Sequence, residues 1–181
     1  MKKIMIIALL FFIGFQSQAQ FTKASLQASG LTCSMCNNAI YKALKALPFV
    51  SAVESNIKHS SFEVVFKENT PVEIDALKDA VEDAGFSVAV FTLTGNFDHI
   101  SIANDSHVEI GGRHFHFLNV TSRVLDGPQT ITVVDKGFLT TKNFKKYSAA
   151  TKMACVQTGK AGACCKKAGV SEQARIYHVT I

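Results

Sequence analysis

The apolar and polar positions between Phe21 and Leu93 follow two periods in turn. Apolar residues at every second position are typical of half-buried strands, whereas apolar residues three or four positions apart are typical of helices. The first period predicts strands at 22–29, 50–56, 61–66 and 86–93. The second period predicts helices at 36–47 and 71–84.

Residues at the element ends agree with this order. Lys58-His59-Ser60 predicts a turn that joins two antiparallel strands. Thr70 is the expected N-cap of the second helix, with Pro71 at its first position and Glu73 completing a capping box. Gly85 is placed to end that helix.

The elements follow the order β-α-β-β-α-β, which is the split arrangement of a ferredoxin-like domain. We therefore predict an α+β protein whose first domain, residues 21–94, is ferredoxin-like. Gly95-Asn96 is the expected boundary. Beyond it we predict a small β-rich domain, residues 95–181, with a partly open OB-like barrel as its expected topology.

Short β-like runs separated by turns distinguish this second half. They lie at 99–103, 108–110, 114–124, 130–134 and 175–181. Gly111-Gly112 and Asp126-Gly127-Pro128 are the expected turns between them. A helix or loop is expected at 143–150, and the Cys/Gly/Lys-rich stretch 155–169 is expected to lie outside the core.

The first twenty residues indicate the compartment in which the protein is expected to function. Two lysines precede an apolar run from Ile4 to Phe15, and a polar patch with small residues follows. This is the layout of a secretory signal peptide over residues 1–20, and the run is too short for a membrane span. We expect an exported protein, in the periplasm of a Gram-negative bacterium, with no stable membrane span.

The charge balance argues against a nucleic-acid partner. The chain has 19 Lys+Arg and 14 Asp+Glu, a net charge of +5, and lacks a long basic run. Without residues 1–20, the remaining 17 basic and 14 acidic residues leave +3. The sequence shows no Ser/His/Asp set, phosphate loop or paired acids placed for hydrolysis, so we expect a protein that is not an enzyme.

Five cysteines carry the candidate chemistry, and Cys33-Ser34-Met35-Cys36 is the central feature. Two thiols at the mouth of a helix can converge on one ion, and the helix N-terminus favours the thiolate form. Thiolates select soft ions such as Cu(I), whereas structural Zn(II) usually takes four protein ligands. A redox pair of thioredoxin type and a structural disulfide remain the alternatives.

Residues 22–93 resemble the heavy-metal-associated domain, the family of copper chaperones, copper-ATPase N-terminal modules and periplasmic mercury-binding proteins. The run from Gly30 to Cys36 is similar to the family's G-M-T-C-x-x-C loop, with Leu31 in place of methionine, and Gly85-Phe86 is similar to its G-[YF] pair. The resemblance implies Cys33 and Cys36 as ligands.

The same resemblance implies two neighbours of the metal loop. Phe86 is expected to lie close to it, and Thr32, where zinc-selective relatives often carry an acid, favours copper. Cu(I) is the expected ion, with Hg(II) or Zn(II) as alternatives. A protein metal donor or acceptor in the cell envelope is the expected partner.

A possible second site lies in the other half of the chain. His114 and His116 flank Phe115 and would point to one face of a strand, where His107 or His99 could join them. Cys155, Cys164 and Cys165 either close a disulfide loop or bind a second soft metal, with Met153 and a histidine. His178 is a weaker candidate, and Phe115 and Phe117 are expected in the core.

Three functions are compatible with these residues. The first is an exported Cu(I) chaperone or scavenger that uses the CxxC loop. The second is a thiol-disulfide oxidoreductase, or a mercury-binding protein, of the cell envelope. The third is an envelope interaction protein whose working surface lies in the second half.

Overall fold

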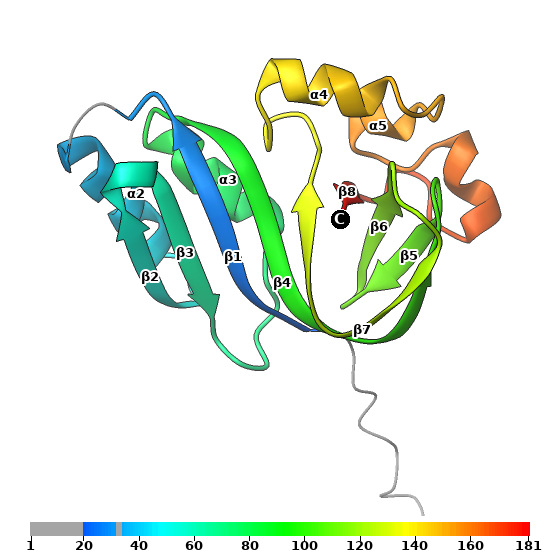
Figure 1. Ribbon diagram of the computed structural model, residues 1–181, viewed down its shortest axis with the longest axis horizontal. Coiled ribbons are helices and arrows are strands. Elements are labelled where there is room, and N and C mark those ends of the chain that lie inside the picture. The colour runs from blue at the N-terminus through cyan, green and yellow to red at the C-terminus, as the bar shows by residue number, and fades with distance from the viewer. Residues whose placement is uncertain (1–19, 32–33) are drawn as a thin grey trace, which may run out of the picture.

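One sheet of eight strands runs through the whole molecule in the computed structural model, which describes residues 20–31 and 34–181 (Figure 1). The strand order is β2-β3-β1-β4-β7-β8-β6-β5. The expected signal peptide, apart from its last residue, lies outside the described residues. Among those described, no helix is long and apolar enough to cross a membrane.

The first half has the predicted ferredoxin-like order. Its elements are β1 (Gln20–Ser29), α2 (Ser34–Lys45), β2 (Val50–Asn56), η1 (Ile57–His59), β3 (Ser61–Phe66), α3 (Ile74–Asp83) and β4 (Ser87–Ile102). All strand pairs in this half are antiparallel. The two helices pack against each other and against the sheet. The large apolar residues of each helix face the core, namely Ile40 and Leu44 of α2 and Ile74, Leu77 and Val81 of α3, so burial of one helix face accounts for their position.

The predicted capping box at α3 is wrong. The helix begins at Ile74, its N-cap residue is Glu73, and that side chain makes no capping hydrogen bond. The Thr70 hydroxyl instead donates to the carbonyl of Glu68. The Glu73 carboxylate is engaged elsewhere, because it lies 2.7 Å from Arg113 of the second half.

The expected boundary at Gly95-Asn96 lies inside β4, which runs on for several residues. β4 pairs with β1 through its first part and with β7 (Arg123–Val133) through its second. The expected turn at Asp126-Gly127-Pro128 lies inside β7, directly opposite: Asn96 faces Pro128 and Phe97 faces Gly127. Both turn signals therefore mark a bend in a continuous pair of strands, with a register shift between Phe97 and Ile100.

The second half extends the same sheet. Its elements are β5 (His107–Ile110), β6 (Arg113–Phe117), β7, α4 (Thr141–Ser148), α5 (Cys155–Thr158), η2 (Ala163–Ala168) and β8 (Ile176–Thr180). β8 lies between β7 and β6, antiparallel to the first and parallel to the second. The described strands form one linear order that ends at β2 and β5, so the OB-like barrel is not confirmed.

The Cys-rich stretch is not peripheral, contrary to the sequence prediction. Cys155 and Cys165 belong to one small buried cluster and are 2% and 0% exposed. Ile176 of β8 and Val170 complete the packing. Short helical turns let this glycine-rich segment fold over the sheet, with Gly159 and Gly169 in the left-handed conformation that ends each turn.

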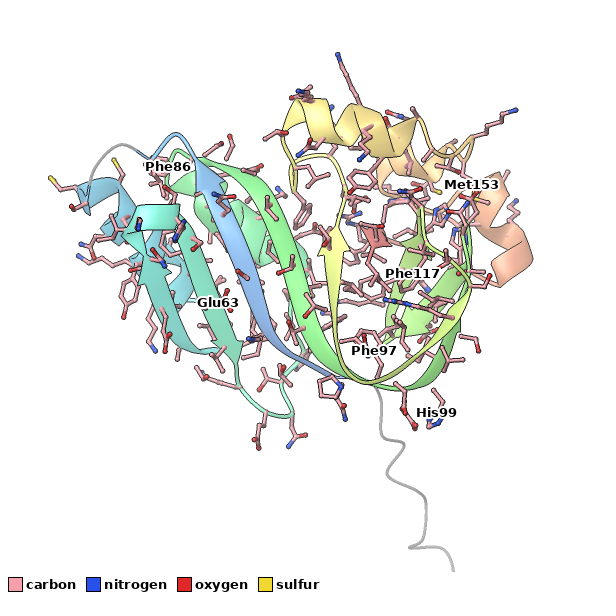
Figure 2. The ribbon with its side chains drawn as sticks, in the orientation of Figure 1. Glu63, Phe86, Phe97, His99, Phe117 and Met153 are labelled. Carbon is pink, nitrogen blue, oxygen red and sulfur yellow. The ribbon has the colours of Figure 1, made fainter. Side chains whose placement is uncertain are left out.

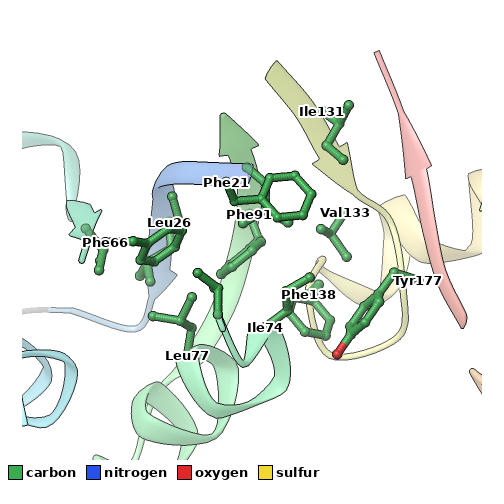
Figure 3. Close-up of a cluster of buried hydrophobic side chains, with 14 of the residues drawn as sticks. Phe21, Leu26, Phe66, Ile74, Leu77, Phe91, Ile131, Val133, Phe138 and Tyr177 are labelled. Atoms are coloured by element: carbon green, nitrogen blue, oxygen red, sulfur yellow. The ribbon is translucent and has the colours of Figure 1, made fainter. Parts of the chain in front are cut away.

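A single large core joins the two halves (Figure 3). Phe21 at the start of β1 contacts Phe97 and Phe115, with ring centroids 6.3 and 5.6 Å apart. Phe91 of β4 packs edge-on against Phe138, 5.1 Å away. Phe115 and Phe117 are both fully buried, as expected.

Candidate metal centres

The first candidate site lies where β1 passes into α2. Cys36 is half-buried in the first turn of α2, at the head of the stripe that continues through Ile40 and Leu44 at intervals of four residues. Met35 beside it is 83% exposed. Thr32 and Cys33 lie outside the described residues. The structure therefore gives the position of one of the two predicted ligands, Cys36. It lies at a helix N-terminus that is open to solvent on one side.

Phe86 lies at the same end of the sheet (Figure 2). Ser29, the last residue of β1, pairs with Ser87, and its hydroxyl lies 3.2 Å from the Ser87 carbonyl oxygen. This pairing brings Phe86 next to the start of the loop at Gly30. Leu31, which stands in place of the family's methionine, packs against the main core.

The second candidate site is a row of histidines across three strands. His107 of β5 is the register partner of His116 of β6, and His116 is the register partner of His178 of β8. The rings of His107 and His116 stack with centroids 4.3 Å apart, and His178 lies 5.0 Å from His116. Because register partners point to the same face of a sheet, the three imidazoles form one continuous group.

Cys155 approaches this row from α5. Its Sγ lies 3.6 Å from Nδ1 of His116 and 3.4 Å from Nε2 of His178. Ligand atoms of His107, His116 and Cys155 all lie within 4.8 Å of one another. Met153, labelled in Figure 2, packs against the cluster that holds Cys155. One thiol and three imidazoles, drawn from four separate elements, therefore come together, with His107 half-buried and the other three side chains buried.

Each of two histidines also contacts a carboxylate with its other nitrogen. His178 Nδ1 lies 2.6 Å from Oδ1 of Asp135, which also accepts the His178 backbone N–H. His116 Nε2 lies 3.2 Å from Oδ1 of Asp105. Such carboxylate contacts orient the ring and leave the opposite nitrogen with its lone pair.

The surroundings of His107 and His116 keep these two rings neutral. Burial, together with the positive charge that His107 and His178 would carry, lowers the pKa of His116 to about 4, although Asp105 acts in the opposite direction. Burial and the charge of His178 likewise lower the pKa of His107. At neutral pH these two imidazoles are therefore uncharged, the form in which they ligate metals.

The predicted second site is brought together only in part. Cys155 and His116 meet, and His107 joins them. His114 is not in the group of closely spaced ligand atoms, and His99 lies exposed beside Asp98 and Asp126.

The remaining predicted thiols have different outcomes. Cys165 is buried in the same cluster as Cys155. The side chain of Cys164 lies outside the described residues, so the disulfide alternative stays a prediction.

Sequence reasoning undervalued His178 and missed Asp135. Asp135 is 3% exposed and lies just beyond β7, where it accepts hydrogen bonds from His178 and from Arg175, the latter at 2.8 Å. The one signal in the sequence was the position of this acid directly after the strand-like run Ile131-Thr132-Val133-Val134. An acid that is buried there needs partners, so its position could have directed attention to it.

Known proteins resemble the first half of the chain. The heavy-metal-associated domain matches residues 25–87. The copper chaperone CopZ of Staphylococcus haemolyticus is 32% identical over 63 residues, which are 35% of this chain and 91% of that protein. The probable copper-transporting ATPase HMA5 of Arabidopsis thaliana is 27% identical over 82 residues, 45% of this chain, and the chain spans only 8% of the ATPase. A solved structure of the yeast copper transporter domain CCC2A is 30% identical, covering 37% of this chain and 90% of that one with a TM-score of 0.33.

The family match ends at residue 87, so the histidine row and Cys155 lie beyond it. Three observations within the matched residues agree with this family. The strands follow the ferredoxin-like order, and Cys36 lies half-buried at the start of α2. The identity with the CopZ chaperone extends over more than nine tenths of that protein's length. Through this part of its sequence, the chain belongs to the heavy-metal-associated domain family.

Proposed function

We propose that the protein is an exported Cu(I) chaperone or scavenger that holds the ion between Cys33 and Cys36. The observation that carries the proposal is the position of the CxxC pair, in the loop that leads into α2 of a heavy-metal-associated domain. Two thiolates serve Cu(I) well, and the helix N-terminus stabilises them.

The surroundings of Cys36 support transfer rather than storage. No acidic residue lies in the first turn of α2, and the neighbouring Met35 thioether is exposed to solvent. Two protein sulfurs leave coordination positions free for a ligand from a partner protein, so the ion can move by ligand exchange. The partner is a protein donor or acceptor of copper in the envelope.

Copper is favoured as the ion by the relatives, which are named as a copper chaperone and copper-transporting proteins. Thr32 provides no acid for Zn(II) at the loop. Hg(II) also binds two thiolates, so a competition experiment with Hg(II) belongs in the test.

The test is an anaerobic titration of the reduced protein with Cu(I) against a competing chelator. The Cys33→Ser/Cys36→Ser variant should lose one equivalent, and Ser34→Ala, a change between the two thiols, should keep it. X-ray absorption of the ion held by the loop should report two sulfur neighbours. Equal binding by the double variant and the parent would reject the proposal, and disulfide-exchange turnover that persists with chelator present would favour an oxidoreductase.

Export is tested separately. Cell fractionation of the source organism should recover a chain that lacks residues 1–20 from the periplasm. Recovery of the intact chain from the cytoplasm would contradict this part of the proposal.

A further inference from the structure

We propose that Cys155, His116 and His178, with His107 as a fourth donor, form a second metal site that takes copper or zinc. This site lies in the half of the chain that the family match does not reach. It shares no residue with the CxxC loop, so it stands or falls independently of the proposed function.

The distances fit a metal centre. With metal–sulfur bonds near 2.3 Å and metal–nitrogen bonds near 2.0–2.1 Å, a tetrahedral angle places a sulfur and a nitrogen ligand about 3.5 Å apart. Cys155 Sγ lies 3.4 Å from His178 Nε2 and 3.6 Å from His116 Nδ1. Each nitrogen therefore already lies at the spacing from the sulfur that two ligands of one ion would have.

The proton count also favours an ion. Asp135 and Asp105 each contact the far nitrogen of a histidine, so His178 Nε2 and His116 Nδ1 both direct a lone pair at the same sulfur. A thiol at Cys155 carries one proton, which can satisfy only one of these two nitrogens. A metal cation accepts the lone pairs of both nitrogens and of the thiolate together.

His107 supplies a further observation. Its Nε2 is buried and, within the described part of the chain, has no hydrogen-bond partner. An unpaired buried polar atom is destabilising, so such atoms usually have a partner. A ring nitrogen of His107 lies within 4.8 Å of ligand atoms of Cys155 and His116, and coordination of the ion through Nε2 would provide the missing partner.

The donor set limits the identity of the ion. One thiolate with imidazoles suits copper and zinc, whereas calcium and magnesium require oxygen ligands. The two carboxylates serve as hydrogen-bond acceptors behind the histidines, an arrangement that recurs around metal-ligating histidines.

The same contacts could be interpreted as a nucleophilic cysteine with His178 as base and Asp135 as orienting acid. Burial argues against this interpretation. Cys155 is 2% exposed and His178 is fully buried, so a substrate has no open approach to the sulfur. A nucleophile would also leave the second imidazole, His116, without a role.

Cys155, His116 and His178 are buried whereas Cys36 is half-buried, so the two sites should exchange their ions at different rates. The ligands of the second site come from β5, β6, β8 and α5, so release of the ion requires α5 to move away from the sheet. We therefore expect slow exchange with external chelators, in contrast to rapid exchange at Cys36.

The test uses the full chain with Cys33→Ser and Cys36→Ser in place, which removes the loop site. This protein is loaded separately with Cu(I) and with Zn(II), passed through a desalting column and analysed for bound metal. We expect one retained equivalent of at least one of these ions, and X-ray absorption should report one sulfur together with nitrogen neighbours.

Three further variants in this background locate the ligands. Cys155→Ser and, separately, His178→Gln should lose the retained equivalent, while His114→Ala, two residues from His116 on the same strand, should keep it. Circular dichroism checks that each variant is folded. Two ligand variants are used so that the test still gives an answer if one of them fails to fold.

Any of three results would overturn the proposal. The first is a folded parent that retains neither ion. The second is retention that survives both ligand variants. The third is mass-spectrometric detection of Cys155 in a disulfide with Cys164 or Cys165 in protein isolated without reductant.

Discussion

At the scale of single residues, Asp135 is a charged side chain that is almost fully buried. Its carboxylate is buried and lies 2.6 Å from His178 Nδ1 and 2.8 Å from the Arg175 guanidinium. Removing one partner of a buried charged pair costs more than the pair contributes, because the other partner stays buried without compensation. Arg175 keeps a second acid, Asp75, so part of that cost is relieved.

We predict that Asp135→Asn lowers the free energy of unfolding by roughly 3 kcal/mol, the lower end for a broken buried pair. Metal affinity at the second site should fall by roughly 10- to 100-fold, since His178 loses the acid that orients it. Urea denaturation and a chelator competition measure the two effects. Asp98→Asn, an exposed acid, is the control, and a variant that matches this control on both measures would contradict the prediction.

At the scale of elements, the bend in β4 and β7 decides the shape of the sheet. Gly127 has a φ of +65°, a left-handed conformation that L-residues adopt at a cost. Pro128 follows at a point where β7 pairs with β4 alone among the described strands, and such an unpaired strand edge is where proline is tolerated. Figure 1 shows both strands curving at this level before they continue toward β5 and β6.

We predict that Gly127→Ala destabilises the protein by about 1–2 kcal/mol through backbone strain. An added Cβ would meet no atom within 4 Å, so the effect isolates the conformational cost. Gly162→Ala is the matched control, because it is equally open but has a φ of −133°. Denaturant midpoints compare the two, and equal midpoints would show that the left-handed conformation carries no cost here.

At the scale of the whole molecule, the two halves are joined by more than the shared sheet. Arg175, just before β8, makes two hydrogen bonds of 3.0 Å to the carboxylate of Asp75 in α3, and the Tyr177 hydroxyl donates to the same group. The guanidinium also lies 4.1 Å from the Tyr177 ring centroid. These contacts attach the C-terminal strand to a helix of the family domain.

This link predicts an acid-sensitive contribution to stability. Burial alone would raise the pKa of Asp75, but the hydrogen bonds and charge of Arg175, with Tyr177 and Lys78, outweigh it and lower the pKa below 3.8. The unfolded chain then binds the proton more readily, so the contribution is complete above about pH 5 and is lost as the pH falls through the lowered pKa.

We expect Asp75→Asn to cost about 1 kcal/mol at pH 7, because both partners are partly exposed. The difference from the parent should shrink toward zero as the pH is lowered below 3.8. Urea denaturation across this range measures it. Asp83→Asn, an exposed acid at the end of the same helix, should stay within about 0.5 kcal/mol of the parent throughout. A difference for Asp75→Asn that is constant with pH would exclude the charge as its cause.

Much of the first half was determined by local sequence. Periodic apolar positions predicted its four strands and two helices, and the run from Gly30 to Cys36 pointed to the family, because period and motif are properties of neighbouring residues. Even here the capping box predicted at the start of α3 was wrong, since the Glu73 side chain pairs with Arg113, forty positions further along the chain. Residues so far apart in the chain leave no mark in a local pattern.

Only the tertiary structure decided how the second half is built and what it brings together. Glycine and proline signalled breaks at residues 95–96 and 126–128, but pairing of β4 with β7 turned both into a bend, because a turn residue permits a change of direction without requiring a strand to end. Strand register likewise set His107, His116 and His178 side by side under Cys155. Residues at 107 and 178 become neighbours only when three strands align, so the sequence could name the candidate ligands and the fold alone could assemble them.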